Sequence, residues 1–173
     1  FVPGLAGDGS TYYYDDIAVV TPVELPVDFE LAAASYDFEG FEGADSAIEA
    51  NPDMMGNPSA TVMRSTKTVG AQFYAGTLLN LDTPIDFSAS EMISIKSWSP
   101  KNDIPVRVRL ENVDNTVGIE LDVNTTVASG WETLTYDFTG LTAGTDFVRV
   151  VVFFEFVPGL AGDGSTYYYD DIA

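Results

Sequence analysis

Carboxylates are the most abundant side chains in this sequence that could take part in acid and base chemistry. The chain has 27 Asp and Glu residues against 7 Lys and Arg, and it contains neither His nor Cys. Imidazole bases, thiolate nucleophiles and the usual zinc ligands are therefore missing. Two carboxylates could still cooperate in glycoside hydrolysis. However, the adjacent pairs Asp15-Asp16 and Asp170-Asp171 would point to opposite faces of a strand. We therefore expect no catalytic residues and no enzyme activity.

A set of aromatic and basic side chains could instead contact a ligand. Their positions along expected strands place them on outward faces. Sugar rings present apolar C–H faces edged with hydroxyl groups, so aromatic platforms beside hydrogen-bonding side chains suit carbohydrate. The candidates for glycan binding are Tyr74, Lys96, Trp98, Arg107 and Arg109. Trp98 could instead cap the end of the fold, and Trp131, at the start of a strand, is expected to pack rather than to bind.

A formal net charge of −20 at pH 7 narrows the classes of partner. Such a surface repels nucleic-acid phosphates and anionic lipids, so we expect neither nucleic-acid binding nor membrane insertion. Neutral glycans and divalent cations remain compatible, although the acidic surface could simply keep an exported protein soluble. With 46% hydrophobic and 13% aromatic residues, the 173-residue chain is expected to bury one sizeable core.

The elements that position these residues are expected to be strands, because β-branched and aromatic residues alternate with polar ones along most of the chain. Val106, Val108 and Leu110 share one face of such a strand and belong to the core. Only residues 44–50 hint at a helical turn, so helical crossovers between parallel strands are not expected. The sequence predicts an all-β fold, an antiparallel β-sandwich of the jelly-roll type. The expected strands cover residues 27–31, 60–65, 72–81, 92–98, 105–111, 117–123, 132–138, 147–156 and 167–172.

One segment, residues 149–156 (RVVVFFEF), is apolar on both of its faces. This pattern is typical of a central strand. Its outward face is either covered by a loop or forms the apolar floor of a groove.

An internal repeat is the strongest signal in the sequence. Residues 1–18 (FVPGLAGDGSTYYYDDIA) recur without change as residues 156–173, which points to near-identical copies of one unit in a longer protein. We expect residues 1–18 to be the last strand region of a preceding copy, residues 19–24 a linker, and residues 25–173 the sandwich module. Residues 1–18 could pair with a neighbouring copy by strand exchange, or they could be an unstructured leader.

Three stretches carry a family resemblance: residues 25–30 (LPVDFE), 131–138 (WETLTYDF) and 167–172 (YYYDDI). Together they resemble the carbohydrate-binding-module-like, galactose-binding-type jelly rolls of bacteria. The resemblance covers roughly residues 25–173. It is greatest to modules that Bacteroidota attach to secreted polysaccharide-degrading enzymes or join in tandem in large cell-surface proteins. The first and last stretches are moderately specific, and the middle one is less so.

The resemblance implies a structural calcium ion near the meeting of the first and last strands. The matching ligands are Glu30 and either Asp170 or Asp171, with Asp28 as a further candidate. Calcium prefers six to eight hard oxygen ligands, and a glycine-rich loop over residues 39–43 could add carbonyl groups. The alternative is that these acids lie at strand ends and turns in water.

Two functions remain open from the sequence. The repeat favours a non-catalytic, extracellular module, stabilised by calcium, in a long cell-surface adhesin, stalk or filament, with neighbouring copies as its partners. The alternative is a carbohydrate-binding module that directs a secreted polysaccharide-degrading enzyme to its glycan.

Overall fold

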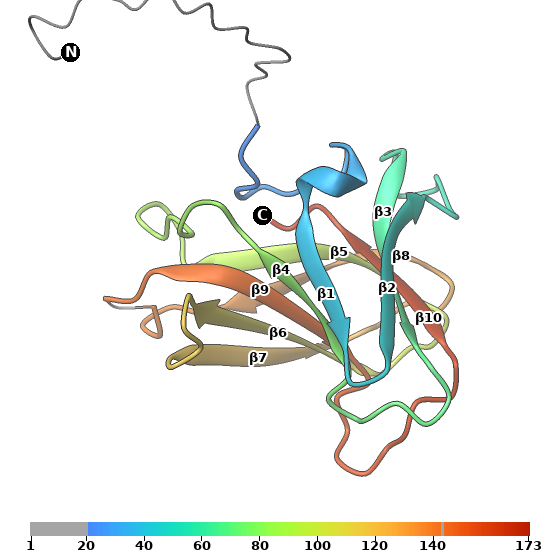
Figure 1. Cartoon of the computed structure of the whole chain (residues 1–173). Helices are drawn as coiled ribbons and strands as arrows, with labels where there is room; N and C mark the ends of the chain where they lie inside the picture. Colours follow the sequence, from blue (N-terminus) through green and yellow to red (C-terminus); the bar gives the residue numbers. More distant parts are fainter. Residues whose placement is uncertain (1–20, 143) are drawn as a thin grey trace, which may run out of the picture.

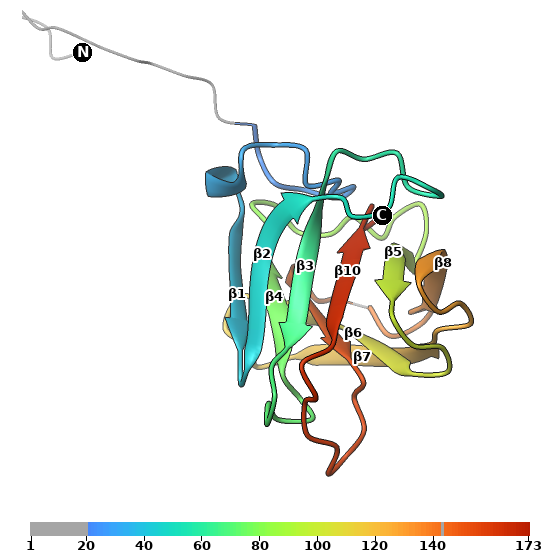
Figure 2. The same ribbon diagram turned by 90° about the vertical axis from the view of Figure 1, so that its right-hand side faces the viewer.

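Two five-stranded antiparallel sheets packed face to face make up the fold (Figures 1 and 2). The computed structural model describes residues 21–142 and 144–173. Its strands are β1 (Asp37–Phe41), β2 (Ala44–Ala50), β3 (Thr61–Lys67), β4 (Gly76–Asn80), β5 (Met92–Ser99), β6 (Pro105–Asn112), β7 (Gly118–Asn124), β8 (Gly130–Asp137), β9 (Phe147–Phe154) and β10 (Thr166–Asp170).

The sheets are named here after their central strands. The β9 sheet has the order β1-β4-β9-β6-β7, and the β10 sheet has the order β2-β3-β10-β5-β8. The part of the chain that the structure describes contains a single 3-10 turn, Ala33–Ser35, and no helix that could cross a lipid bilayer. The predicted all-β antiparallel sandwich is therefore confirmed.

The core lies between the two sheets and is filled by alternate residues of each strand. Val106, Val108 and Leu110 of β6 are completely buried, as their alternation with arginines predicted. Across the core, the rings of Phe154 on β9 and Tyr167 on β10 stack with centroids 4.5 Å apart. Burial of these apolar surfaces is the main force that holds the sheets together.

Strand β9 lies at the centre of its sheet, between β4 and β6, in agreement with the two-faced apolar pattern of residues 149–156. Val150 and Val152 face the opposite sheet, whereas Val151 and Phe153 lie on the outer face. The outer face of this strand is therefore an apolar surface that polar side chains of the flanking strands can frame.

Residues 44–50 do not form the helical turn expected from the sequence. They are strand β2, which pairs with β3 along its whole length. Because β2 is an edge strand with half-buried and exposed side chains, its sequence lacks the buried stripe that marks inner strands such as β5. The expected loop over residues 39–43 is likewise the end of β1 and the turn that joins β1 to β2.

Residues 27–31 do not form the expected strand. They contribute one bridge, between Val27 and Ile172. Phe29 has a φ of 54°, which breaks an extended conformation, and its ring is buried against Tyr169 with centroids 5.7 Å apart. Packing of this aromatic ring therefore overrides the local strand preference.

The first and last described segments meet at one end of the sandwich (Figure 1). Val27 and Ile172 exchange two backbone hydrogen bonds of 2.9 Å, and Ala173 pairs with Ser94. Val23, within the expected linker, is buried, and its carbonyl accepts a hydrogen bond from the amide of Asp82. The expected strand region over residues 1–18 lies outside the described residues.

Candidate functional site

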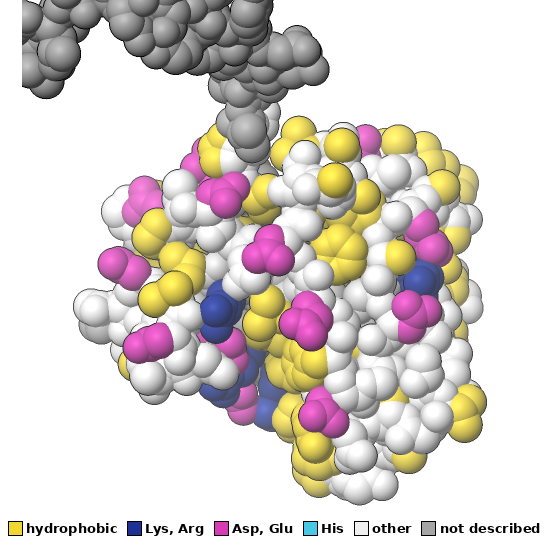
Figure 3. Space-filling view, viewed as in Figure 1, with side chains coloured by type: hydrophobic (Ala, Val, Ile, Leu, Met, Phe, Trp, Pro, Cys, Tyr) yellow, Lys and Arg dark blue, Asp and Glu magenta, His cyan; other side chains and the backbone are white. Residues whose placement is uncertain are grey.

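A groove of about 510 Å³ crosses the outer face of the β9 sheet. In Figure 3, basic and hydrophobic side chains lie next to each other on this face. All five strands of the sheet and three loops contribute lining residues: Glu39, Phe41, Tyr74, Leu78, Arg107, Arg109, Glu111, Asn115, Glu120, Val151, Phe153 and Phe156.

Two cross-strand rows of residues, in register on neighbouring strands, build the groove. Four interstrand spacings give each row a length of about 19 Å, enough for an extended ligand. One row is Phe41, Gly76, Phe153, Arg107 and Asp122, and the other is Glu39, Leu78, Val151, Arg109 and Glu120. A Cβ atom at Gly76 would lie 2.7 Å from Cδ1 of Phe153, so glycine leaves the space that this ring occupies.

Aromatic rings gather at the end of the groove where β4 begins and β9 ends. Phe153 packs edge-to-face against Phe41 and against Phe156, with ring centroids 5.8 and 5.3 Å apart. Phe73 packs in the same manner against Phe156 and Tyr74, at 5.3 and 5.0 Å. Tyr74 is 38% exposed and forms part of the wall of the groove. Such interlocked rings form a rigid apolar platform.

Arg107 lies on this platform and is held there by carboxylates. Its Cζ atom is 3.7 Å from the centroid of the Phe156 ring, a cation–π contact. Its Nε and Nη2 atoms donate to Asp122 at 2.7 and 2.8 Å. These hydrogen bonds to Asp122 raise the pKa of Arg107 above its ordinary value. The guanidinium is thus fixed in charge and in orientation.

Arg109, two residues further along β6 on the same face, is also held by carboxylates. Its Nε atom donates to Glu111 at 2.7 Å and its Nη1 atom donates to Glu120 at 2.9 Å. The guanidinium lies over Gly118, where a Cβ atom would collide with it. The other carboxylate oxygen of Glu120 accepts from Nη1 of Arg107 at 2.5 Å. Glu120 therefore joins the two arginines.

Lys67, at the end of β3, fixes the two loops that carry the aromatic residues. Its side chain is buried, and its ammonium donates to the carbonyls of Phe73, Phe154 and Glu155 at 3.0, 3.1 and 2.9 Å. Burial lowers the pKa of Lys67. Because one ammonium binds both loops, the positions of Tyr74 and Phe156 are coupled through it.

The structure brings together three of the five glycan-binding candidates. Tyr74, Arg107 and Arg109 line the groove. Trp98 and Lys96 face outward as expected, but they belong to β5 in the opposite sheet. There Trp98 packs edge-to-face against Tyr168, with ring centroids 5.5 Å apart. The two sets cannot contact one ligand together.

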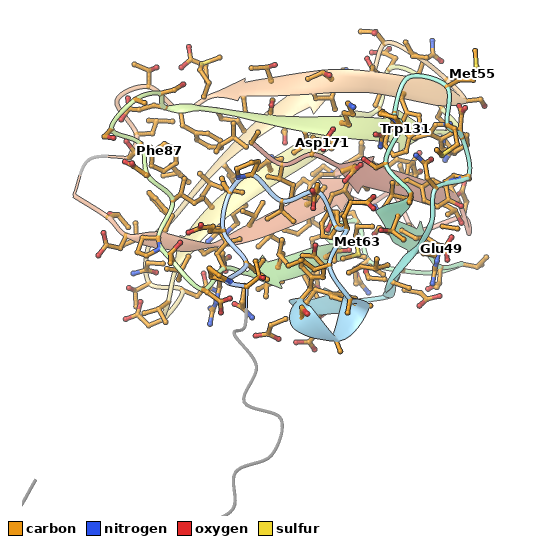
Figure 4. The ribbon with its side chains drawn as sticks, turned by 90° about the horizontal axis from the view of Figure 1, so that it is seen from above. Glu49, Met55, Met63, Phe87, Trp131 and Asp171 are labelled. Atoms are coloured by element: carbon orange, nitrogen blue, oxygen red, sulfur yellow. The ribbon has the colours of Figure 1, made fainter. Side chains whose placement is uncertain are left out.

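Several groove residues were not among the candidates: Phe41, Phe153, Phe156, Glu39 and Glu120. The apolar outward face of residues 149–156 was the signal for Phe153 and Phe156, because it indicated a groove floor as one of two interpretations. Phe41 and Glu39 lie in a segment expected to be a loop. Trp131, which was expected to pack, is half-buried. Its indole nitrogen donates to the carbonyl of Asp53 at 2.7 Å, and Figure 4 shows it beside the β2–β3 loop that carries Met55.

The calcium candidates at the start of the module accept hydrogen bonds from backbone amides. The carboxylate of Glu30 accepts from the amide of Thr61 at 3.0 Å. The carboxylate of Asp28 accepts from the amide of Glu30 at 3.1 Å. Among residues 21–142 and 144–173, no three acidic side chains lie close enough together to hold a metal ion.

The candidates at the end of the module differ from each other in burial. Asp171 (Figure 4) pairs with Lys96 at 2.9 Å. Asp170 is completely buried, and Asn57 donates to its Oδ2 atom at 2.7 Å. Its Oδ1 atom has no hydrogen-bond partner within the described part of the chain. This orphaned oxygen is the feature most compatible with a cation, and calcium binding stays a prediction.

The comparisons with known proteins identify the fold. No family model matches the sequence, and no curated protein matches it. The family 11 carbohydrate-binding module from Clostridium thermocellum, in complex with a β-1,3-1,4-mixed-linked tetrasaccharide, has 19% identity and a TM-score of 0.56 over 90% of this chain and 95% of that module. A family 29 module complexed with mannohexaose has 15% identity and a TM-score of 0.51 over 90% and 91%.

An enzyme is also similar in structure, through a small part of its length. An arabinose-bound family 51 α-L-arabinofuranosidase has 14% identity and a TM-score of 0.62, covering 91% of this chain but 27% of the enzyme. The chain thus spans about a quarter of that protein, whereas it spans nearly the full length of the two carbohydrate-binding modules. The fold of this chain is that of the carbohydrate-binding-module β-sandwiches.

Proposed function

We propose that this chain is a non-catalytic, extracellular module that binds carbohydrate in the groove of the β9 sheet. The observation that carries the proposal is the groove itself, in which a rigid aromatic platform adjoins fixed arginine and carboxylate groups along about 19 Å. Aromatic rings suit the C–H faces of sugars, and carboxylates and guanidinium groups suit their hydroxyls.

The structural neighbours support this proposal over the adhesin interpretation, since two of them hold oligosaccharides and match this chain over almost their whole length. An attached polysaccharide-degrading enzyme would then be the natural context of the module. The interpretation as a repeat of a stalk or filament is a second candidate, and the exact recurrence of residues 1–18 favours it.

Substitutions of aromatic residues in the groove test the proposal. Tyr74→Ala and Phe156→Ala each remove one ring from the platform, so we expect each to weaken binding of a soluble polysaccharide by about tenfold. Retention in native gels that contain the polysaccharide, followed by calorimetric titration, measures the change. Trp98→Ala is the matched control, because Trp98 lies on the opposite sheet, and we expect it to bind as the wild type does. Equal affinity in Tyr74→Ala, Phe156→Ala and the wild type would refute the site.

A further inference from the structure

The two arginines of the groove would ordinarily indicate an anionic ligand, because guanidinium groups pair well with carboxylate and sulfate oxygens. The contacts of Arg107 and Arg109 argue against it. Arg107 uses Nε and Nη2 for Asp122 and Nη1 for Glu120, and Phe156 covers one face of its guanidinium. Arg109 uses Nε for Glu111 and Nη1 for Glu120.

The charge of this cluster is negative once all its members are counted. Glu111, Glu120 and Asp122 pair with the two arginines. Glu39 adds a fourth carboxylate in the lining. Four carboxylates therefore face two guanidinium groups, and the next cross-strand row adds one group of each charge, Asp37 and Arg149, so the balance stays negative within a molecule whose net charge is −20. An incoming anion would therefore meet net repulsion from the carboxylates around the two arginines.

Glu120 is the carboxylate best placed to keep an anion away from the two arginines. It is the only one of the three paired acids that contacts both arginines, with one oxygen on each. Its side chain is 36% exposed, so it stands at the surface of the groove, whereas Glu111 is buried beneath Arg109. Removing the charge of Glu120 would free one Nη1 group on each arginine at the place where a ligand passes.

We propose that the groove selects uncharged glycans and that Glu120 is the residue that determines this selectivity. The inference rests on the proposed function of the groove and adds the class of its ligand. Arginines locked by acids donate hydrogen bonds to sugar hydroxyls without offering a net positive charge, while the carboxylates accept hydrogen bonds from the same hydroxyls. A neutral glycan can form both kinds of hydrogen bond. A glycan that carries uronic acid or sulfate groups can accept hydrogen bonds from the arginines, but its charge is repelled by the carboxylates.

The test compares each of three neutral polymers, mixed-linkage β-glucan, glucomannan and β-1,4-galactan, with its own derivative oxidised to the uronic acid at C6. We expect the wild type to bind at least one of the neutral polymers and not to bind the oxidised form of that polymer. Glu120→Gln keeps the size and one acceptor oxygen but loses the charge, and we expect it to shift the ratio of the two affinities about fivefold toward the oxidised form. Asp45→Asn is the control, because it removes one charge at an arginine pair on the opposite sheet. The inference is overturned if the wild type binds the oxidised form, or if Glu120→Gln has the same ratio of affinities for the two forms as the wild type.

A second measurement separates this inference from the proposed function. Titration with sulfate, followed through the Nε–H signals of the arginines by NMR, needs no glycan. We expect no shift in the wild type and a saturable shift in Glu120→Gln. If no polymer is retained at all, the proposed function fails, while the sulfate titration still decides whether Glu120 blocks anions. A shift in the wild type equal to that in Glu120→Gln contradicts the assignment.

Discussion

Asp170 is a carboxylate enclosed by the protein with only half of its hydrogen-bonding capacity used. Asn57 satisfies one oxygen and the other has no partner among the described residues. Burial raises the pKa of Asp170 above its ordinary value of 3.8, against the hydrogen bond from Asn57. Folding therefore favours the protonated form of this group.

The sign of the resulting pH dependence follows from linkage. Because the pKa is higher in the folded than in the unfolded state, the contribution of Asp170 to stability is fully present below 3.8 and is lost as the pH rises through the folded pKa. We expect Asp170→Asn to be more stable relative to the wild type at neutral pH than at acid pH. Chemical denaturation of both proteins across this range measures the difference, with the exposed Asp45→Asn as control. A difference that does not vary with pH would contradict the burial of a charged Asp170.

Calcium would reverse the cost of this buried charge. If the ion binds at Asp170 as predicted, it stabilises the folded state in proportion to its affinity, by about 2.7 kcal/mol at a hundredfold excess over the dissociation constant. We expect calcium to raise the thermal midpoint of the wild type, EDTA to reverse the increase, and Asp170→Asn to show neither effect. Identical midpoints of the wild type with calcium and with EDTA would remove this site from consideration.

At the scale of elements, the loops around the groove depend on one buried cation. Lys67→Met has a similar length but lacks all three N–H donors, which leaves three carbonyls without that partner. We expect the free energy of unfolding to fall by about 3 kcal/mol. Hydrogen exchange of the backbone amides in residues 70–75 and 155–165 should accelerate beyond that of the core. Lys96→Met serves as control, since Lys96 is partly exposed. Uniformly faster exchange throughout the sandwich would mean that Lys67 only stabilises the fold.

Most strands could be predicted because each buries every second residue, as β5 and β6 do. Strands β1 and β2 could not, because their side chains are mostly half-buried or exposed and leave no stripe. The same limit applies to the site. Alternation correctly placed Trp98 and Arg107 outward, yet β5 and β6 follow each other in the chain and belong to different sheets. Only long-range pairing decides which outward residues share a face.

At the scale of the whole molecule, the recurrence of residues 1–18 predicts strand exchange. Strand β10 lies between β3 and β5, in the interior of its sheet. Residues 1–18 contain the same sequence, so in a second molecule they could occupy this position. We expect the full chain to form oligomers in size-exclusion chromatography with light scattering, and a variant without residues 1–18 to be a monomer. Oligomers that persist in the shortened variant would exclude this mode of exchange.

The bridge between Val27 and Ile172 has a mechanical consequence. Because the described chain begins and finishes at one end of the sandwich, tension applied at these two points would load the hydrogen bonds of Val23 with Asp82 and of Ala173 with Ser94, and next the two hydrogen bonds of that bridge. Strand β10 would then be peeled away from its neighbours a few bonds at a time instead of being sheared along its length. We expect a domain loaded in this geometry to open at a lower force than one whose strands are sheared. It is better suited to carry a binding surface beside its attachment point than to transmit load along a fibre.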